Sequence, residues 1–251
     1  AYSLPRSALD GLGYGATELR LYSLEQAKSF PVSTGFTDDK NPAWDPSGKY
    51  LYFISNRSID PIVDQREWNF ALTKTSKPCV LVLAADGKSP FLPDELKDPK
   101  DKKKAKKSGE KAAGTAGAKD EDKDEDAGDD AESKIELPEV KIDTDGLSDR
   151  VVQCPIPPDN YTGLHATSDK LFFAQFPTQG MNDEPEDDEP RSKANLLSFD
   201  FETKKVEPFI ENVRDFTFSL DDKKIAYRTE EEILFCTSES KPAESEGPKD
   251  K

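Results

Sequence analysis

NPAWDPSGKYLYFISNR, residues Asn41–Arg57, predicts a β-hairpin. We expect a first strand over Pro42–Trp44, a tight turn over Asp45–Gly48, and a second strand over Tyr50–Ser55, where aromatic and β-branched residues predominate. Within the turn, Pro46 presets φ, the glycine tolerates positive φ, and the aspartate carboxylate accepts hydrogen bonds from backbone N–H groups. Strand formers and turn chemistry therefore agree on one local structure.

The same layout recurs further along the chain. Asp215–Arg228 (DFTFSLDDKKIAYR) repeats it closely, and Leu164–Phe176 (LHATSDKLFFAQF) is a degraded copy. Further predicted strands lie between the copies, at Glu18–Leu24, Cys79–Ala84 and Leu196–Phe201. Such units at a spacing of about 40 to 60 residues are typical of four-stranded propeller blades. We therefore predict an all-β protein, a β-propeller of four-stranded antiparallel blades.

The predicted blades are too few to close a ring. We expect a partial blade over residues 1–35, a blade over 36–150, a blade over 151–212, a partial blade over 213–237 and a polar tail over 238–251. Closed propellers have about 4 to 8 blades. The chain is therefore expected to hold an incomplete set.

Two charged insertions interrupt this pattern. Residues 97–134 carry a lysine-rich block, a Gly/Ala stretch and an acidic block, without any aromatic residue. Residues 182–190 (NDEPEDDEP) form a shorter acidic loop. Such segments bury too little apolar surface to offset their conformational entropy, so we expect both to be disordered. The first is expected to lie between the third and fourth strands of its blade.

Composition limits the function classes. The formal net charge is −16, which argues against nucleic acid as a partner because phosphate binding needs clustered Lys and Arg. No apolar run approaches the ~20 residues of a membrane span. Cys79, Cys154 and Cys236 are widely spaced and fit reduced, buried thiols. No signal peptide is visible, so we expect a cytoplasmic protein, or a periplasmic one if a leader precedes this sequence.

Catalytic and cofactor motifs are absent from the sequence. It has no G-x-S-x-G elbow, no H-E-x-x-H, no P-loop and no C-x-x-C. The glycine-rich run Gly11–Ala16 is followed by a strand pattern rather than a helix, so it is interpreted as a loop. The single histidine, His165, is interpreted as structural. We expect no cofactor and no metal, and we expect the chain alone not to be an enzyme.

Several stretches resemble a known family. DPSGKYLYF (Asp45–Phe53) is similar to the short repeat of TolB and of tricorn proteases. Longer segments resemble the second, seven-bladed propeller of tricorn-type serine proteases: Gly35–Arg57, Glu67–Thr75 (EWNFALTKT), Ile142–Leu164 and Phe199–Arg228. The likeness spans Ala1 to Thr237 apart from the two charged insertions.

The resemblance implies a non-catalytic propeller that filters peptides and channels them to a serine peptidase site in another domain. None of the family's catalytic residues has a matching position here. The implied partners are peptides or unfolded polypeptide and the PDZ and catalytic domains of the same protease, and a homo-oligomer is left open. Arg57 and Arg228 close hairpins interpreted as corresponding, and they are the candidate substrate-binding residues; the alternative for each is a solvated surface arginine.

Two other readings stay open at this point. The chain fits a stand-alone TolB-like propeller that acts as a protein-binding scaffold. It also fits, less well, the propeller of a prolyl-oligopeptidase-type enzyme, which would continue into an α/β-hydrolase domain with a G-x-S-x-G elbow.

Overall fold

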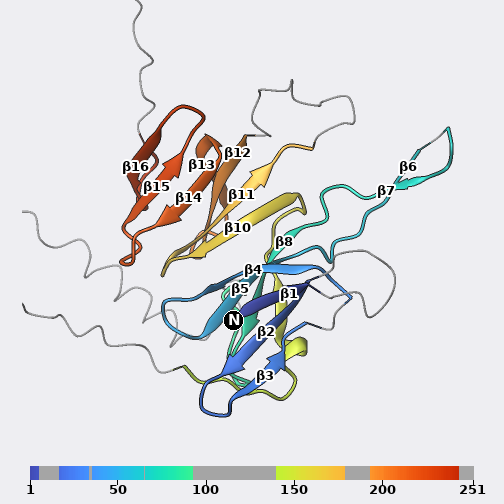
Figure 1. The fold of residues 1–251 in the computed structure, drawn as a ribbon, viewed down its shortest axis with the longest axis vertical. Helices are drawn as coiled ribbons and strands as arrows, with labels where there is room; N and C mark the ends of the chain where they lie inside the picture. The colour runs from blue at the N-terminus through green and yellow to red at the C-terminus, as the bar shows by residue number, and fades with distance from the viewer. Residues whose placement is uncertain (6–16, 34–35, 65, 93–139, 179–192, 243–251) are drawn as a thin grey trace, which may run out of the picture. The chain divides into compact units, whose positions relative to one another are not determined.

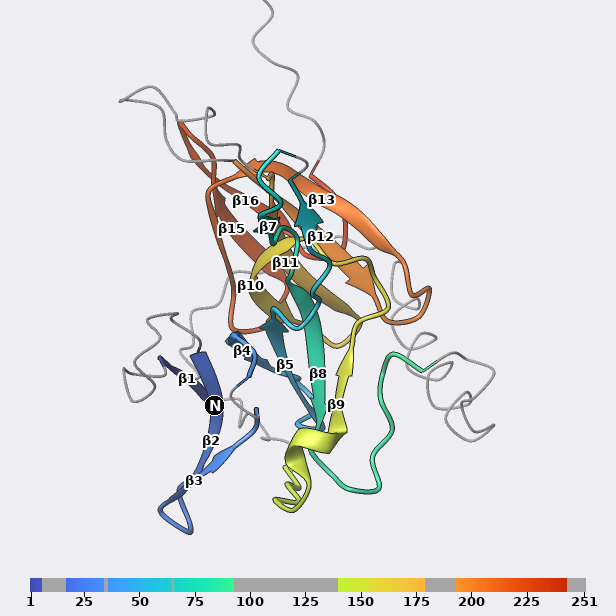
Figure 2. The same ribbon diagram turned by 90° about the vertical axis from the view of Figure 1, so that its right-hand side faces the viewer.

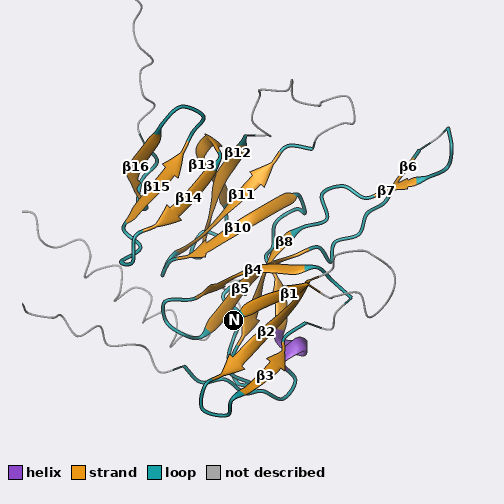
Figure 3. Ribbon diagram, viewed as in Figure 1, coloured by secondary structure: helices purple, strands orange, loops and turns teal. Residues whose placement is uncertain are grey.

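The computed structural model describes residues 1–5, 17–33, 36–64, 66–92, 140–178 and 193–242. These residues form strands and one short 3-10 helix, η2 (Leu147–Arg150), as Figure 3 shows. All the strands belong to one compact unit, made of residues 1–91 and 139–251. The predicted all-β fold is confirmed.

Four antiparallel sheets of three or four strands make up most of the fold, and a two-stranded hairpin forms a fifth sheet (Figure 1). Sheet one contains β1 (Tyr2–Pro5), β2 (Thr17–Ser23) and β3 (Lys28–Pro31). Sheet two contains β4 (Asp39–Trp44), β5 (Tyr50–Ser55), β8 (Lys77–Val82) and β9 (Val151–Gln153). Sheet three contains β10 (Asn160–Ala166), β11 (Lys170–Phe176), β12 (Ala194–Asp200) and β13 (Val206–Val213). Sheet four contains β14 (Asp215–Phe218), β15 (Lys224–Arg228) and β16 (Ile233–Thr237).

The sheet topology is that of propeller blades. Sheets two and three have four strands each, and sheets one and four have three each among the described residues. Within each sheet the strands follow one another in chain order. The sheets described do not close into a ring, so the predicted incomplete propeller is confirmed. The limits predicted for each blade stay a prediction.

The hairpin predicted over Asn41–Arg57 forms as its turn residues indicate. The Asp45 N–H donates to the Tyr50 carbonyl (3.1 Å), and the Gly48 N–H donates to the Asp45 carbonyl (2.9 Å). The Asp45 carboxylate accepts a further bond from the Lys49 N–H (3.3 Å). Gly48 has φ 71°, the left-handed region that glycine reaches without steric cost.

The other two predicted hairpins are also present. In sheet four the Ser219 N–H donates to the Lys224 carbonyl and the Asp222 N–H donates to the Ser219 carbonyl, each at 2.9 Å. Asp222, with φ 59°, takes the place of the turn glycine. In sheet three a shorter turn closes with the Thr167 N–H on the Lys170 carbonyl (2.9 Å).

The segment Ser58–Thr75 connects β5 to β8 and contains a two-stranded hairpin, β6 (Ile62–Val63) and β7 (Phe70–Ala71). The sequence analysis did not predict these two strands. Strands of two residues are too short to produce a recognisable alternation of apolar and polar residues. In Figure 1 this hairpin stands away from the four sheets.

The first charged insertion lies where it was expected in the topology. β8 pairs with β9 although the predicted insertion separates them in sequence, and η2 directly precedes β9 (Figure 2). The insertions themselves (97–134 and 182–190), the glycine-rich run and residues 243–251 lie outside the described residues. Their predicted disorder therefore stays a prediction.

The core depends on strands that are apolar on both faces. Along β5, Leu51 and Phe53 enter the core shared with sheet one, whereas Tyr52 and Ile54 enter the core shared with sheet three. All four side chains are at most 1% exposed. Since successive side chains of a strand point to opposite faces, sheet two needs a neighbour on each side.

β11 repeats this arrangement, and the outer sheets do not. Phe173 enters the core with sheet two, whereas Phe172 enters the core with sheet four. In β15, by contrast, Ile225 and Tyr227 are buried while Lys224 on the other face is exposed. The burial pattern therefore separates inner sheets from outer ones.

Replacing Gly48 with valine is expected to destabilise the protein by about 1–2 kcal/mol, because a β-branched residue is disfavoured at positive φ. Gly48→Asn is expected to cost less, since asparagine tolerates this region. Urea unfolding followed by circular dichroism measures both. Equal midpoints for the three proteins would contradict a conformational requirement at this turn.

Candidate functional site

Arg57, a predicted substrate-binding residue, is held against the hairpin that it follows. Its Nη2 lies 3.3 Å from Asp39 Oδ1, and its Nε donates to Ser55 Oγ (2.8 Å). The guanidinium carbon lies 5.7 Å from the centre of the Phe53 ring. Because the Asp39 side chain is fully buried, Arg57 neutralises a carboxylate that is removed from water. These contacts give Arg57 a structural role, and its contact with peptide stays a prediction.

Arg228 closes the hairpin of sheet four that corresponds to the hairpin before Arg57. The turn hydrogen bonds align Ser219 with Asp45, and counting from the turn then aligns Arg228 with Ile54 rather than with Arg57. Arg228 ends β15 with an exposed side chain. The two arginines therefore follow corresponding turns at different distances, and the contact of Arg228 with peptide stays a prediction.

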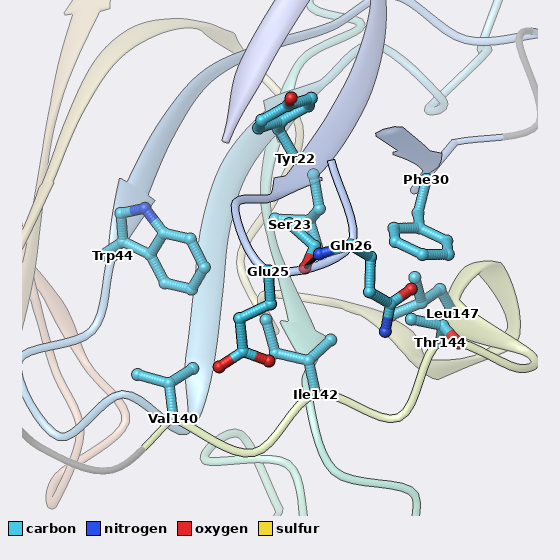
Figure 4. A pocket seen from close by; sticks show the side chains of 11 residues that line it. Tyr22, Ser23, Glu25, Gln26, Phe30, Trp44, Val140, Ile142, Thr144 and Leu147 are labelled. Carbon is cyan, nitrogen blue, oxygen red and sulfur yellow. Dashed lines mark hydrogen bonds between the residues drawn. The ribbon is translucent and has the colours of Figure 1, made fainter. Parts of the chain in front are cut away.

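A pocket of about 290 Å³ lies where sheets one and two meet. Its walls come from the β2–β3 hairpin, the end of β4 and the segment that leads into η2. Figure 4 shows Trp44 and Phe30 on opposite sides, with Glu25 and Gln26 from the β2–β3 turn between them. The lining residues are Leu21, Tyr22, Ser23, Glu25, Gln26, Phe30, Trp44, Val140, Ile142, Thr144 and Leu147.

The lining suits an apolar side chain. Tyr22 and Trp44 are 50% and 42% exposed, so their rings offer accessible apolar surface. Glu25 supplies the one charged side chain among the lining residues. A ligand that combines an apolar group with a nearby cation therefore matches this pocket best.

His165 in sheet three contacts residues of sheet four. Its Nε2 lies 2.7 Å from Asp222 Oδ1, and its ring stacks on Phe218 with centroids 3.9 Å apart. The contact joins β10 of sheet three to the β14–β15 hairpin of sheet four. These contacts agree with the structural interpretation of this histidine.

The three cysteines are free thiols. Cys79 and Cys154 are buried as expected, whereas Cys236 is only partly buried because it lies on an outer sheet. Burial raises the pKa of the Cys79 thiol to about 12 and raises the pKa of Cys154 as well. Thiols with raised pKa values are poor nucleophiles, so neither is a candidate for covalent catalysis.

The described residues hold neither a cluster of metal ligands nor a membrane-spanning helix. No group of three or more His, Cys, Asp or Glu side chains there is arranged to hold a metal ion. Within the same residues, no helix has the length and apolar character needed to cross a membrane.

Sequence reasoning missed the pocket because its residues come from three distant segments. Tyr22, Trp44 and Ile142 are each ordinary strand or loop residues when taken alone. Trp44, at the end of a predicted strand, was the one local signal in the sequence. Only the stacking of sheet one on sheet two brings these side chains together.

Stacked four-stranded antiparallel sheets of this topology define an incomplete β-propeller. The model of the tricorn protease second beta propeller domain matches residues 1–239. The chain belongs to this family.

Relatives extend the comparison. The chain is 24% identical to the tricorn protease of Thermoplasma volcanium, over 97% of this chain and 20% of that protein. It is 27% identical to tricorn protease homolog 1 of Streptomyces coelicolor, over 83% of this chain and 18% of the relative. A crystal structure of the tricorn protease covers 94% of this chain and 20% of its own, with a TM-score of 0.69 and 22% identity. The structural match supports the fold, and the chain spans about a fifth of these proteins.

Arg57→Ala is expected to lower the free energy of unfolding by about 2–3 kcal/mol, because the buried Asp39 carboxylate loses its cation. The double variant Asp39→Asn, Arg57→Ala is expected to recover part of this loss, since it removes the buried charge. Arg228→Ala serves as the matched control, with a change below about 0.5 kcal/mol. Equal losses for the two arginine variants in urea unfolding would contradict this assignment.

Proposed function

We propose that this chain is a non-catalytic β-propeller segment of a tricorn-like serine peptidase, which filters peptide substrates and channels them to a catalytic domain outside this chain. One observation carries the proposal. The second-propeller model matches residues 1–239, while the relatives, named as proteases, are about five times as long as the matched region. A propeller of this kind contributes access and scaffolding rather than chemistry.

The first strands of consecutive sheets supply a surface suited to this role. Asn41 Oδ1 in β4 accepts hydrogen bonds from the Gly163 N–H (3.3 Å) and from Thr162 Oγ1 (3.2 Å) in β10. A Cβ built on Gly163 would lie 3.3 Å from the ring of Phe216, so β10 and β14 also approach closely. The first strands of sheets two, three and four are therefore neighbours.

These strands offer backbone groups to an extended peptide. β4, β10 and β14 each end their sheet among the described residues, so one edge of each carries N–H and C=O groups outside the sheet ladder. Backbone contacts of this kind do not depend on peptide sequence. They support a filter that admits extended chains of many sequences.

Bulges interrupt the same strands. The register of β4 against β5 shifts between Lys40 and Ala43, and that of β10 against β11 shifts between Thr162 and Leu164. Asn41 and Gly163 have φ of 53° and 58° at these points. A bulge bends its strand, so the free edge offers a peptide only short regular runs of partners. Short runs favour passage over stable capture.

A stand-alone protein-binding scaffold is the second candidate. Exposed aromatic side chains on the described surface, such as Trp44 and Trp68, favour it. It differs from the first proposal in needing no catalytic domain.

Peptidase activity separates the two candidates. This chain and the product of its complete natural reading frame are each incubated with fluorogenic peptides. We expect cleavage only by the longer product, inhibited by a serine-directed reagent. A reading frame that adds no hydrolase domain, or a longer product without activity, would overturn the peptidase proposal and favour the scaffold.

The pocket beside Trp44 is expected to bind apolar peptide side chains. In a Trp68→Phe variant, Trp44 is the single tryptophan, and its fluorescence should change saturably when an unstructured peptide rich in leucine and lysine is added. Glu25→Gln is expected to weaken binding about two-fold, as for a partly exposed ion pair. Trp44→Phe, which keeps Trp68, is the control. A linear, non-saturating response in both variants would contradict a peptide site at this pocket.

A further inference from the structure

An arm extends from sheet two between β5 and β8. It comprises residues 59–64 and 66–72 and contains the β6–β7 hairpin, which Figure 1 shows away from the sheets. Six large apolar side chains of the arm are between 42% and 76% exposed: Ile59, Ile62, Val63, Trp68, Phe70 and Leu72. Clusters of exposed apolar residues of this kind mark interaction surfaces.

The arm has a defined structure of its own. The Asp64 carboxylate accepts hydrogen bonds from the N–H groups of Arg66 (3.1 Å) and Glu67 (2.9 Å). The Asp64 N–H donates to the Asn69 carbonyl (2.9 Å), and the Trp68 N–H donates to the Asp64 carbonyl (3.0 Å). The apolar residues are therefore presented on a formed hairpin rather than on an irregular loop.

The base of the arm is fixed to sheet three. The Lys74 N–H donates to Asn160 Oδ1 (3.2 Å), and Lys74 Nζ lies 3.5 Å from Asp159 Oδ2. The Ser58 N–H donates to the Thr75 carbonyl (3.2 Å) and closes the base. These contacts give the arm a fixed starting point on the propeller.

Trp68 at the tip has an unfavourable backbone conformation. Its φ is 58°, a region that bulky residues rarely adopt, and its side chain is 76% exposed. Glycine or asparagine would suit this turn better. A tryptophan here lowers the stability of the free hairpin, and its mostly exposed indole recovers little of that cost through burial.

Both faces of the arm are apolar. In the hairpin Ile62 is opposite Ala71 and Val63 is opposite Phe70. Successive residues of a strand point to opposite faces, so the two pairs lie on different sides. A flat partner surface would cover only one side. The partner must therefore be a cleft with two apolar walls.

We propose that the arm inserts into a two-walled apolar cleft in another domain of the same protease. The inference rests on the proposed function, because the relatives contain about four-fifths of their length outside the matched region. A second copy of this chain is a poorer occupant. The pocket beside Trp44 holds about 290 Å³, room for about one large side chain and too little for both apolar faces of the arm.

Hydrogen exchange measured by mass spectrometry tests the insertion. Peptides covering 59–72 are compared in this chain alone and in the product of the complete reading frame. We expect exchange to slow by about tenfold or more in the longer protein, because burial on both faces protects the hairpin. The exposed turn Thr229–Glu232 is measured in the same experiment as an internal reference.

A substitution with different effects in the two proteins sharpens the test. Trp68→Gly relieves the positive φ, so we expect the isolated chain to keep its melting temperature within about 2 °C or to gain slightly. The same change should abolish the protection of the arm in the longer protein. Leu220→Gly, which removes a large apolar side chain that is 93% exposed, is the matched control and should leave that protection unchanged.

The outcomes distinguish this inference from the proposed function. An active, longer peptidase in which residues 59–72 exchange as fast as in the isolated chain would overturn the insertion and leave the function standing. Slowed exchange that appears only as the concentration of the isolated chain rises would assign the arm to a second copy and overturn the proposal. A reading frame without further domains would overturn both.

Discussion

The structure depends on two strands whose side chains are apolar on both faces. β5 and β11 each contribute to two cores, so sheets two and three are stable only with a sheet on either side. Water is excluded from these cores. Burial is the largest cause of the raised pKa of the Tyr52 phenol. Stacking of sheets is therefore a requirement of the sequence, and the other features follow from it.

Stacking brings functional surfaces together from distant residues. The pocket beside Trp44 exists because sheet one lies on sheet two, and its far wall comes from residues after the first insertion. The row of first strands exists because β4, β10 and β14 lie at matching ends of consecutive sheets. Asn41 links two of these strands with its side chain. Each surface thus belongs to the arrangement of sheets rather than to one segment.

The hairpins, the sheet topology and the incomplete set of blades could be predicted because their signals are local. Turn residues such as Gly48 act through the backbone within a few positions, and the aromatic strands beside them repeat. The different positions of Arg57 and Arg228 could not be predicted, because hydrogen bonds fix the register at the turn and the two hairpins differ in length beyond it. The ion pair of Arg57 with Asp39 crosses a strand pair and has no sequence signature. The strands β6 and β7 were not predicted, because a strand of two residues is too short to show an alternation of apolar and polar residues.

Backbone strain separates the parts of the chain that hold the fold from those that face a partner. Ala27 and Asp222 have positive φ within tight turns between paired strands, where the connection requires it. Trp68 also lies in a turn between paired strands, β6 and β7, but a bulky residue rarely adopts positive φ. Its side chain is 76% exposed and covers no core. Conformational cost without a gain in the chain itself is expected where the gain comes from a bound molecule. The arm is for this reason the surface on which a neighbouring domain should act.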